Sequence, residues 1–210
     1  MKIIDISWPL SPVTTSYKDK KVIQVNTLKE FAKDGVRETS VILGSHSGTH
    51  VDAASHFLQD GTTIDQLDLH QVVGKCRVIE IPHTINGITR EDLLSATGGV
   101  HDGEIILLKT ANSASDCNAP FNPNFVYLER SAAQYVALQN IRAIGIDYLG
   151  IERMQPDHET HILLMQANIV VIEGLRLAVV DPGEYFLVCL PLYMLGVEAA
   201  PARAILIAGV

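Results

Sequence analysis

The chain has few cysteines, fewer basic than acidic residues and no long apolar segment. Its three cysteines, Cys76, Cys117 and Cys189, are far apart, which excludes a dense disulfide framework and favours a reducing compartment. Lys and Arg number 16 against 24 Asp and Glu, and the net charge of −8 disfavours a nucleic-acid partner, because an acidic chain gains nothing from counterion release. The apolar run 186–197 is interrupted by Pro191 and is shorter than the roughly 20 residues that cross a bilayer. No membrane partner is therefore expected, and a cytoplasmic location follows by elimination.

Motifs of several enzyme classes are also missing. The chain contains neither the G-x-x-x-x-G-K-[ST] phosphate-binding loop nor the G-x-G-x-x-G dinucleotide signature. Residues 44–48 resemble a nucleophile elbow in outline, but the central residue is His46 where that motif needs serine, which disfavours a Ser-His-Asp hydrolase. None of the cysteines lies in a recognisable nucleophile motif.

Short apolar segments rich in β-branched residues recur along the chain. Each is bounded by Gly, Pro, Asn or Asp, and the pattern therefore predicts strands. Helical patterns are fewer: Thr89 and Asp92 indicate a capped helix start, and two further helices are predicted over 131–138 and 161–167. We expect a single domain over 1–210, of the α/β or α+β class with a large mixed sheet. The predicted strands are 22–25, 39–43, 77–81, 105–108, 143–146, 169–172, 186–190 and 204–207.

The segment from Gly44 to Phe57 contains three histidines and one aspartate within eleven residues. Two imidazoles and a carboxylate are a common donor set for Zn²⁺, Mn²⁺ or Fe²⁺. We expect this segment to be a loop whose glycines let the side chains of His46, His50 and Asp52 converge on one ion. The alternative is a polar loop whose histidines form only local hydrogen bonds.

A second set of candidates lies in the other half of the chain. His158 and His161 precede an apolar run that ends at Glu173. A buried carboxylate without a partner is very costly, and a metal ion would relieve that cost. A position at a strand end in water explains the pattern of Glu173 equally well, so both interpretations stay open at this point.

Residues 46–57, His-Ser-Gly-Thr-His-Val-Asp-Ala-Ala-Ser-His-Phe, resemble the signature H-x-G-T-H-x-D-A-P-x-H-F of the cyclase family, whose best-known members are the bacterial metal-dependent kynurenine formamidases. Ala54 replaces the usual proline. The resemblance covers nearly the whole chain, and it implies a swivelling β/β/α fold with a mixed central sheet and a homodimer or higher homo-oligomer. Further segments that fit the family are 107–110, 145–148, 172–175, 182–185 and 200–204.

The resemblance also implies a divalent metal cofactor with two ions per subunit, zinc above all, with manganese or iron as alternatives. His161 is preferred over His158 because its separation from Glu173 is the usual one in the family. Asp52 and Glu173 would bridge the ions, and His56 corresponds to the family's proton donor and acceptor. The implied ligands are His46, His50 and Asp52 for one ion, and Asp52, His161 and Glu173 for the other.

The implied activity is metal-dependent hydrolysis of a small amide, foremost an aryl formamide such as N-formylkynurenine, to formate and the free amine in the kynurenine pathway of tryptophan catabolism. Hydrolysis of a cyclic amide such as isatin, or of a related small ester or amide, shares this chemistry and is an alternative. Residues 13–20 lack the Pro-Gly-Asp that helps to shape the pocket in many relatives, so the sequence leaves the substrate open. A third alternative is a metal- or small-molecule-binding protein without turnover. A free imidazole at His56 argues against it, because binding alone needs no proton carrier.

Overall fold

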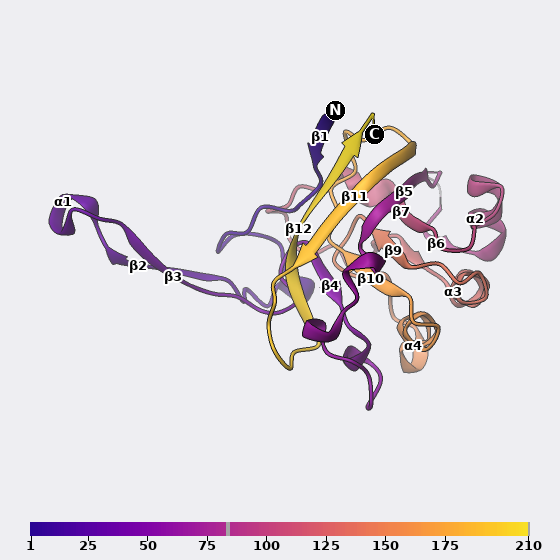
Figure 1. Cartoon of the computed structure of the whole chain (residues 1–210), viewed down its shortest axis with the longest axis horizontal. Helices are drawn as coiled ribbons and strands as arrows, with labels where there is room; N and C mark the ends of the chain where they lie inside the picture. Colours follow the sequence, from indigo (N-terminus) through magenta and orange to yellow (C-terminus); the bar gives the residue numbers. More distant parts are fainter. Residues whose placement is uncertain (83–84, 210) are drawn as a thin grey trace.

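A computed structural model describes residues 1–82 and 85–209 of the chain (Figure 1). Its centre is a mixed sheet in which the parallel strands are direct neighbours and the antiparallel strands lie beside them. No helix within the described part of the chain is long and apolar enough to cross a membrane. The strands of this sheet are β1 (Lys2–Asp5), β4 (His50–Asp52), β5 (Val73–Glu80), β7 (Ile105–Lys109), β9 (Ala143–Ile146), β10 (Val170–Glu173), β11 (Gly183–Pro191) and β12 (Ala199–Ala208).

The central sheet closes on itself. Strands β5, β7, β9 and β10 are parallel neighbours, and β11, β12 and β4 complete a seven-stranded barrel through antiparallel pairings. The long strand β12 closes the barrel, because its start pairs with β4 and its later residues pair with β11. The end of β12 also pairs with β1, which lies outside the barrel. The expected α/β class with a mixed central sheet is confirmed.

Helices cover one side of the parallel strands, as Figure 1 shows. These are α2 (Arg90–Thr97), α3 (Arg130–Ala137) and α4 (Glu159–Gln166). Strand β7 is buried on both faces: Ile105 and Leu107 belong to the cluster inside the barrel, whereas Ile106 and Leu108 pack in the cluster with the helices. The short 3-10 helices are Tyr17–Asp19, Ala54–His56, Ile64–Gln66, Leu69–Gln71, Ala111–Ala114 and Pro156–His158.

A two-stranded arm projects away from the barrel, on the left of Figure 1. It consists of β2 (Gln24–Lys29) and β3 (Glu38–Ile42), with the single helical turn α1 (Phe31–Asp34) at its tip. Nearly every residue of the arm is exposed, including its apolar side chains. An isolated two-stranded hairpin is only marginally stable in water. Because nearly all of the arm is exposed, the barrel adds little to its stability.

Each predicted strand and each predicted helix overlaps an observed one, and Thr89 caps α2 in a capping box with Asp92. The expectation of a loop from Gly44 to Phe57 is wrong in part, because the segment contains strand β4. The three residues of β4 alternate polar, apolar, polar, and such a short pattern carries no strand signal without the flanking strands β10 and β12 that pair with it. The other strands that were not predicted are β1, β6 (Gly87–Ile88) and β8 (Tyr127–Leu128).

Candidate metal centre

The pairing of β4 with β10 places three polar side chains on one face of the sheet. Val51 and Ile172 are fully buried inside the barrel, so their neighbours along each strand point to the opposite face, towards the helices. His50 lies directly opposite Glu173 in the antiparallel register, and Asp52 lies two residues further along β4. Glu173 is therefore a buried carboxylate, which rules out the alternative of a strand end in water.

Helix α4 brings His161 to the same place. Its Nε2 atom lies 3.3 Å from Oε1 of Glu173 and 3.9 Å from Oδ2 of Asp52. His158 instead has 61% of its side chain exposed, and its Nδ1 atom contacts Glu152 at 2.7 Å. The structure thus brings His161, and not His158, to the carboxylates of Asp52 and Glu173.

His46 completes the group from the loop before β4. Its Nδ1 atom lies 3.0 Å from Oδ1 of Asp52. The loop approaches the end of β10 closely at Gly48, and both Gly48 and Gly174 have positive φ angles, of 60° and 69°. A Cβ atom at Gly174 would lie 2.3 Å from the carbonyl oxygen of Gly48, so only glycine permits this approach.

The donor atoms form two overlapping groups of metal-ligating type. One consists of His46, His50 and Asp52, the other of Asp52, His161 and Glu173, and within each group the ligand atoms lie within 4.8 Å of one another. Among the described residues, Nε2 of His50 and both carboxylate oxygens of Asp52 are buried without a hydrogen-bond partner. Buried polar atoms are rarely left unpaired, and a cation between them would satisfy all three. The residues therefore fit a divalent metal.

The electrostatics of the cluster agree with this fit. Burial alone would lower the pKa of His50, but the carboxylates of Glu173 and Asp52 raise it to about 9. Burial likewise opposes protonation of His161, but contacts with Glu152 and Glu173 raise its pKa to about 10. Burial would raise the pKa of Glu173, yet the two imidazoles hold it well below its ordinary value. The carboxylates thus attract positive charge, whether protons on the imidazoles or a metal ion.

His56 lies beside both groups and belongs to neither. Its ring centroid is 4.2 Å from that of His46 and 6.0 Å from that of His161. No hydrogen bond joins its imidazole to another of the described residues. Burial lowers its pKa, so the ring is mostly neutral at pH 7. The arrangement offers an uncommitted imidazole next to a metal-ligating cluster.

Two carboxylates at the edge of the cluster were missed by the sequence reasoning. Glu152 contacts His161, and Glu198 contacts His46, each at 3.3 Å. Neither residue stands in a metal-binding motif or at a ligand-like spacing. The only available signal for Glu152 was an acidic residue a few positions after the predicted strand 143–146.

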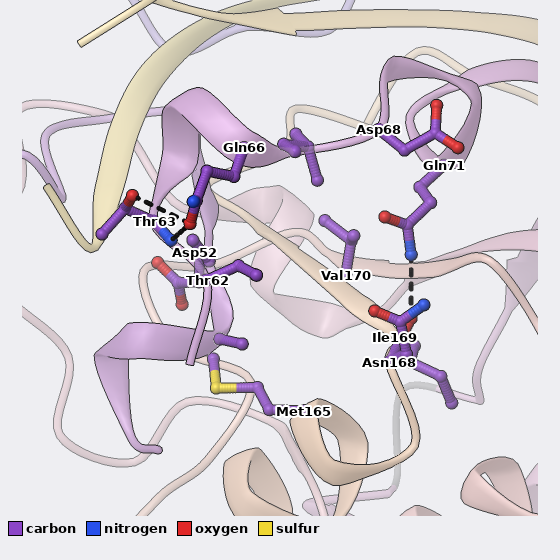
Figure 2. A pocket seen from close by; sticks show the side chains of 13 residues that line it. Asp52, Thr62, Thr63, Gln66, Asp68, Gln71, Met165, Asn168, Ile169 and Val170 are labelled. Atoms are coloured by element: carbon purple, nitrogen blue, oxygen red, sulfur yellow. Dashed lines mark hydrogen bonds between the residues drawn. The ribbon is translucent and has the colours of Figure 1, made fainter. Parts of the chain in front are cut away.

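A pocket of about 190 Å³ borders Asp52 (Figure 2). Its lining is partly polar, and the side-chain amide of Gln71 donates a hydrogen bond across it to the carbonyl of Asn168. This volume is below the roughly 300 Å³ at which pockets for small organic ligands begin. The pocket is therefore smaller than a typical site for an organic substrate.

Several known proteins resemble this chain over most of its length. A family model described as "Putative cyclase" matches residues 4–153. A kynurenine formamidase from Salinibacter ruber is 33% identical over 217 aligned residues, which cover 98% of this chain and 97% of that protein. A solved structure, titled a "predicted metal-dependent hydrolase" from Bacillus stearothermophilus, has 36% identity and a TM-score of 0.87 over 98% of this chain and 97% of that one.

An isatin hydrolase bound to the product analogue thioisatinate has a TM-score of 0.85 over 98% of this chain and 91% of that one. Its sequence identity is only 20%, so this match supports a shared fold and nothing further. Together the solved structures confirm the fold that the sequence resemblance implied.

Proposed function

The chain belongs to the Cyclase family and is an amide hydrolase, and on that premise we propose that it cleaves an aryl formamide such as N-formylkynurenine to formate and the free amine. The match to a kynurenine formamidase over nearly the full length of both chains supports this substrate. Family membership also confirms the resemblance seen in residues 46–57. The observation that carries the proposal is the buried cluster of metal-ligating side chains with the uncommitted imidazole of His56 beside it.

We propose that the cluster holds two divalent ions, zinc foremost, with manganese or iron as alternatives. His46, His50 and Asp52 would hold one ion, and Asp52, His161 and Glu173 the other. Two observations support bridging roles. Oδ1 of Asp52 faces His46 and His50 while its Oδ2 faces His161, and Oε1 of Glu173 faces His161 while its Oε2 faces His50. When bound, divalent ions supply Lewis-acid chemistry, which acidifies water and polarises an amide carbonyl.

Proton transfer falls to His56 in this proposal. Its neutral ring nitrogen takes the proton of the water that attacks the formyl carbon. The same nitrogen then delivers a proton to the amine nitrogen as the C–N bond breaks, which leaves formate and the free amine. The lowered pKa favours the first step, because the imidazole is already deprotonated at neutral pH.

Aromatic side chains near the cluster support an aryl substrate. Phe57 stacks on His161 with 4.5 Å between the ring centroids. Tyr17 packs edge-on against Phe121 at 4.9 Å. The pKa of Tyr17 is raised, first by burial and then by the negative charges of Glu173 and Glu152. A planar aromatic ring would find stacking partners here.

The test is a substrate comparison on metal-reloaded protein. Purified protein is stripped with a chelator, reloaded separately with zinc, manganese or iron, and assayed with N-formylkynurenine and with isatin. We expect kcat/KM for the formamide to exceed that for isatin at least ~10-fold, a difference of about 1.4 kcal/mol in transition-state stabilisation. Activity should disappear on chelation and return on reloading. A preference for isatin would refute the formamide assignment, and turnover that survives chelation would refute the role of the metal.

We also propose that the chain assembles as a homodimer or higher homo-oligomer. The support is the arm of β2, α1 and β3, in which Val25, Leu28, Phe31 and Ile42 are 49–60% exposed. A second exposed apolar segment, 192–195, joins β11 to β12. Exposed apolar side chains in such numbers are typical of an interface, and in our proposal a second copy of the chain covers both segments through a two-fold axis.

Light scattering tests the assembly. The wild-type chain should have at least twice the mass of the monomer, and Phe31→Asp should shift it towards the monomer. The matched control is Leu138→Asp, because Leu138 is 82% exposed but lies outside both apolar segments. A monomeric wild-type chain at micromolar concentration would refute the assembly.

The cytoplasmic location stays a proposal. Cys76, Cys117 and Cys189 are all free thiols, which fits a reducing compartment. Fractionation of cells that express the protein, with a periplasmic or secreted marker as the comparison, tests the location directly.

A further inference from the structure

The three candidate ligand histidines share one arrangement. Each imidazole turns one ring nitrogen to the carboxylates of the cluster and the other to an acceptor outside it. The outer nitrogen carries the proton and donates a hydrogen bond to the acceptor that faces it, so the inner nitrogen keeps its lone pair for a metal. The outer acceptors are the carbonyl of Gly48 for Nδ1 of His50 (2.9 Å), Glu198 for Nε2 of His46 (3.3 Å) and Glu152 for Nδ1 of His161 (3.3 Å).

Glu152 is held rigidly. Only 5% of its side chain is exposed. Its Oε2 atom accepts hydrogen bonds from the backbone N–H groups of Thr160 and His161, at 3.1 and 3.2 Å, in the first turn of α4. Its Oε1 atom lies 2.7 Å from Nδ1 of His158. The carboxylate therefore fixes both the start of the helix and the ring of His161 that the helix carries.

Glu198 is held less firmly. It lies in the turn before β12, and 38% of its side chain is exposed. The oxygen that faces His46 also accepts a hydrogen bond from the hydroxyl of Ser45, at 2.6 Å. The ring of His46 is itself 30% exposed, against 9% for that of His161. Solvent weakens the interaction of an exposed carboxylate with an imidazole, so Glu198 orients its histidine less strongly.

We propose that Glu152 is a positioning residue that makes the group Asp52, His161 and Glu173 the tighter of the two metal sites. The proposal rests on the metal sites of the proposed function. Glu152 selects the tautomer of His161 in which Nε2 faces the cluster, and its negative charge increases the basicity of that ring. Loss of such an outer-shell carboxylate costs about 10- to 100-fold in metal affinity. The site that contains His46 lacks this rigid support and releases its ion more readily.

The test is a zinc titration of the chelator-stripped protein in competition with a chromophoric chelator. Wild-type protein should show a tight and a weaker site. Glu152→Gln keeps the size of the side chain and one acceptor oxygen but removes the charge. This variant should weaken the tight site about 10- to 100-fold and change the weaker site less than ~3-fold. Glu198→Gln should weaken only the other site, and by less.

The matched control is Glu159→Gln. Glu159 lies in the first turn of the same helix and pairs with Arg130, but it makes no hydrogen bond to His161. Removal of its charge changes the helix terminus without changing the support of His161, so both zinc dissociation constants should match those of the wild type. If Glu159→Gln weakens the tight site as much as Glu152→Gln does, the effect belongs to the helix terminus and the proposal is refuted.

Metal release provides a second measurement that does not depend on a Glu152 variant. Wild-type protein transferred to excess chelator should lose zinc in a fast and a slow phase. The fast phase should disappear in His46→Ala, and the slow phase in His161→Ala; the reverse assignment would refute the proposal.

The melting temperature of Glu152→Gln separates positioning from a merely structural role. If this variant melts at a lower temperature but retains the wild-type ratio of the two zinc dissociation constants, the role is structural and the proposal is refuted.

The outcomes separate this proposal from the proposed function. Suppose that the protein binds two zinc ions, one tightly and one more weakly, with the tight site weakened in Glu152→Gln, and yet hydrolyses no amide. That result contradicts the proposed function and supports the role of Glu152. If the protein hydrolyses the formamide but Glu152→Gln binds zinc as tightly as the wild type, the proposed function is supported and the role of Glu152 is refuted.

Discussion

Replacement of His56 by alanine should stop most turnover and leave the metals in place. His56 belongs to neither ligand group, and no hydrogen bond joins its ring to another described residue, so its removal deprives the cluster of no ligand. A positioned acid–base group typically contributes about 10²- to 10⁴-fold, or roughly 3–5 kcal/mol of the activation barrier. The lost contact with Phe57, 4.1 Å between ring centroids, costs the fold on the order of 1 kcal/mol. The variant should therefore be folded, metal-loaded and nearly inactive.

The assay measures kcat and KM on the formamide together with metal content by mass spectrometry. The base must be neutral, so wild-type activity should rise with pH through the pKa of His56, which burial places below its ordinary value of 6.5. His56→Ala should lack this rise, and added imidazole should restore part of the rate. His70→Ala, which removes an exposed imidazole from the 3-10 helix 69–71, is the control and should match the wild type. A kcat within a few-fold of the wild type, or loss of metal from His56→Ala, would refute the assignment.

Three further predictions concern the metals and the loop that carries their ligands. Asp52→Asn removes the carboxylate common to both groups, so mass spectrometry should find both ions depleted; wild-type occupancy would rule out the bridging role. In the metal-free protein the pKa values of His50 and His161 are raised to about 9 and 10, so a metal must displace their protons at pH 7. Affinity should therefore rise with pH from 7 towards 10, and calorimetry in two buffers should detect about two protons released per loaded chain; zero release would contradict this. Ala54→Pro restores the family residue at the start of a 3-10 helix, where the preceding residue Ala53 has the extended backbone (φ −93°, ψ 161°) that proline requires. It should raise the free energy of unfolding by about 0.4–1 kcal/mol in a denaturant titration, and a lower midpoint would show that the ring clashes.

Local patterns in the sequence were enough for the longer elements. The apolar runs of β7 and β9 are confirmed as strands, and Thr89 with Asp92 as the start of α2. These signals work because buried β-branched runs and capping residues act over a few neighbouring positions. Strand β4 could not be found in this way, since its strand geometry comes from pairing with β10 and β12.

The residues of the candidate site likewise fall into those that the local sequence predicted and those that it did not. The spacing within residues 46–57 was sufficient to propose His46, His50 and Asp52 as ligands, because these residues are close along the chain. The choice between His158 and His161 came only from family resemblance. The residues alone also left two environments for Glu173, buried or in water. The catalytic role of His56 stays a prediction.

The sequence by itself therefore determined the strand-rich α/β class, the donor set of one metal group and the family. Only the tertiary structure decided that Glu173 is buried opposite His50, that α4 turns His161 and not His158 towards it, and that Glu152 supports His161 from outside. The physical reason is range. Strand and helix signals act between near neighbours, whereas the environment of a carboxylate depends on strand register and helix packing, which join segments more than a hundred residues apart.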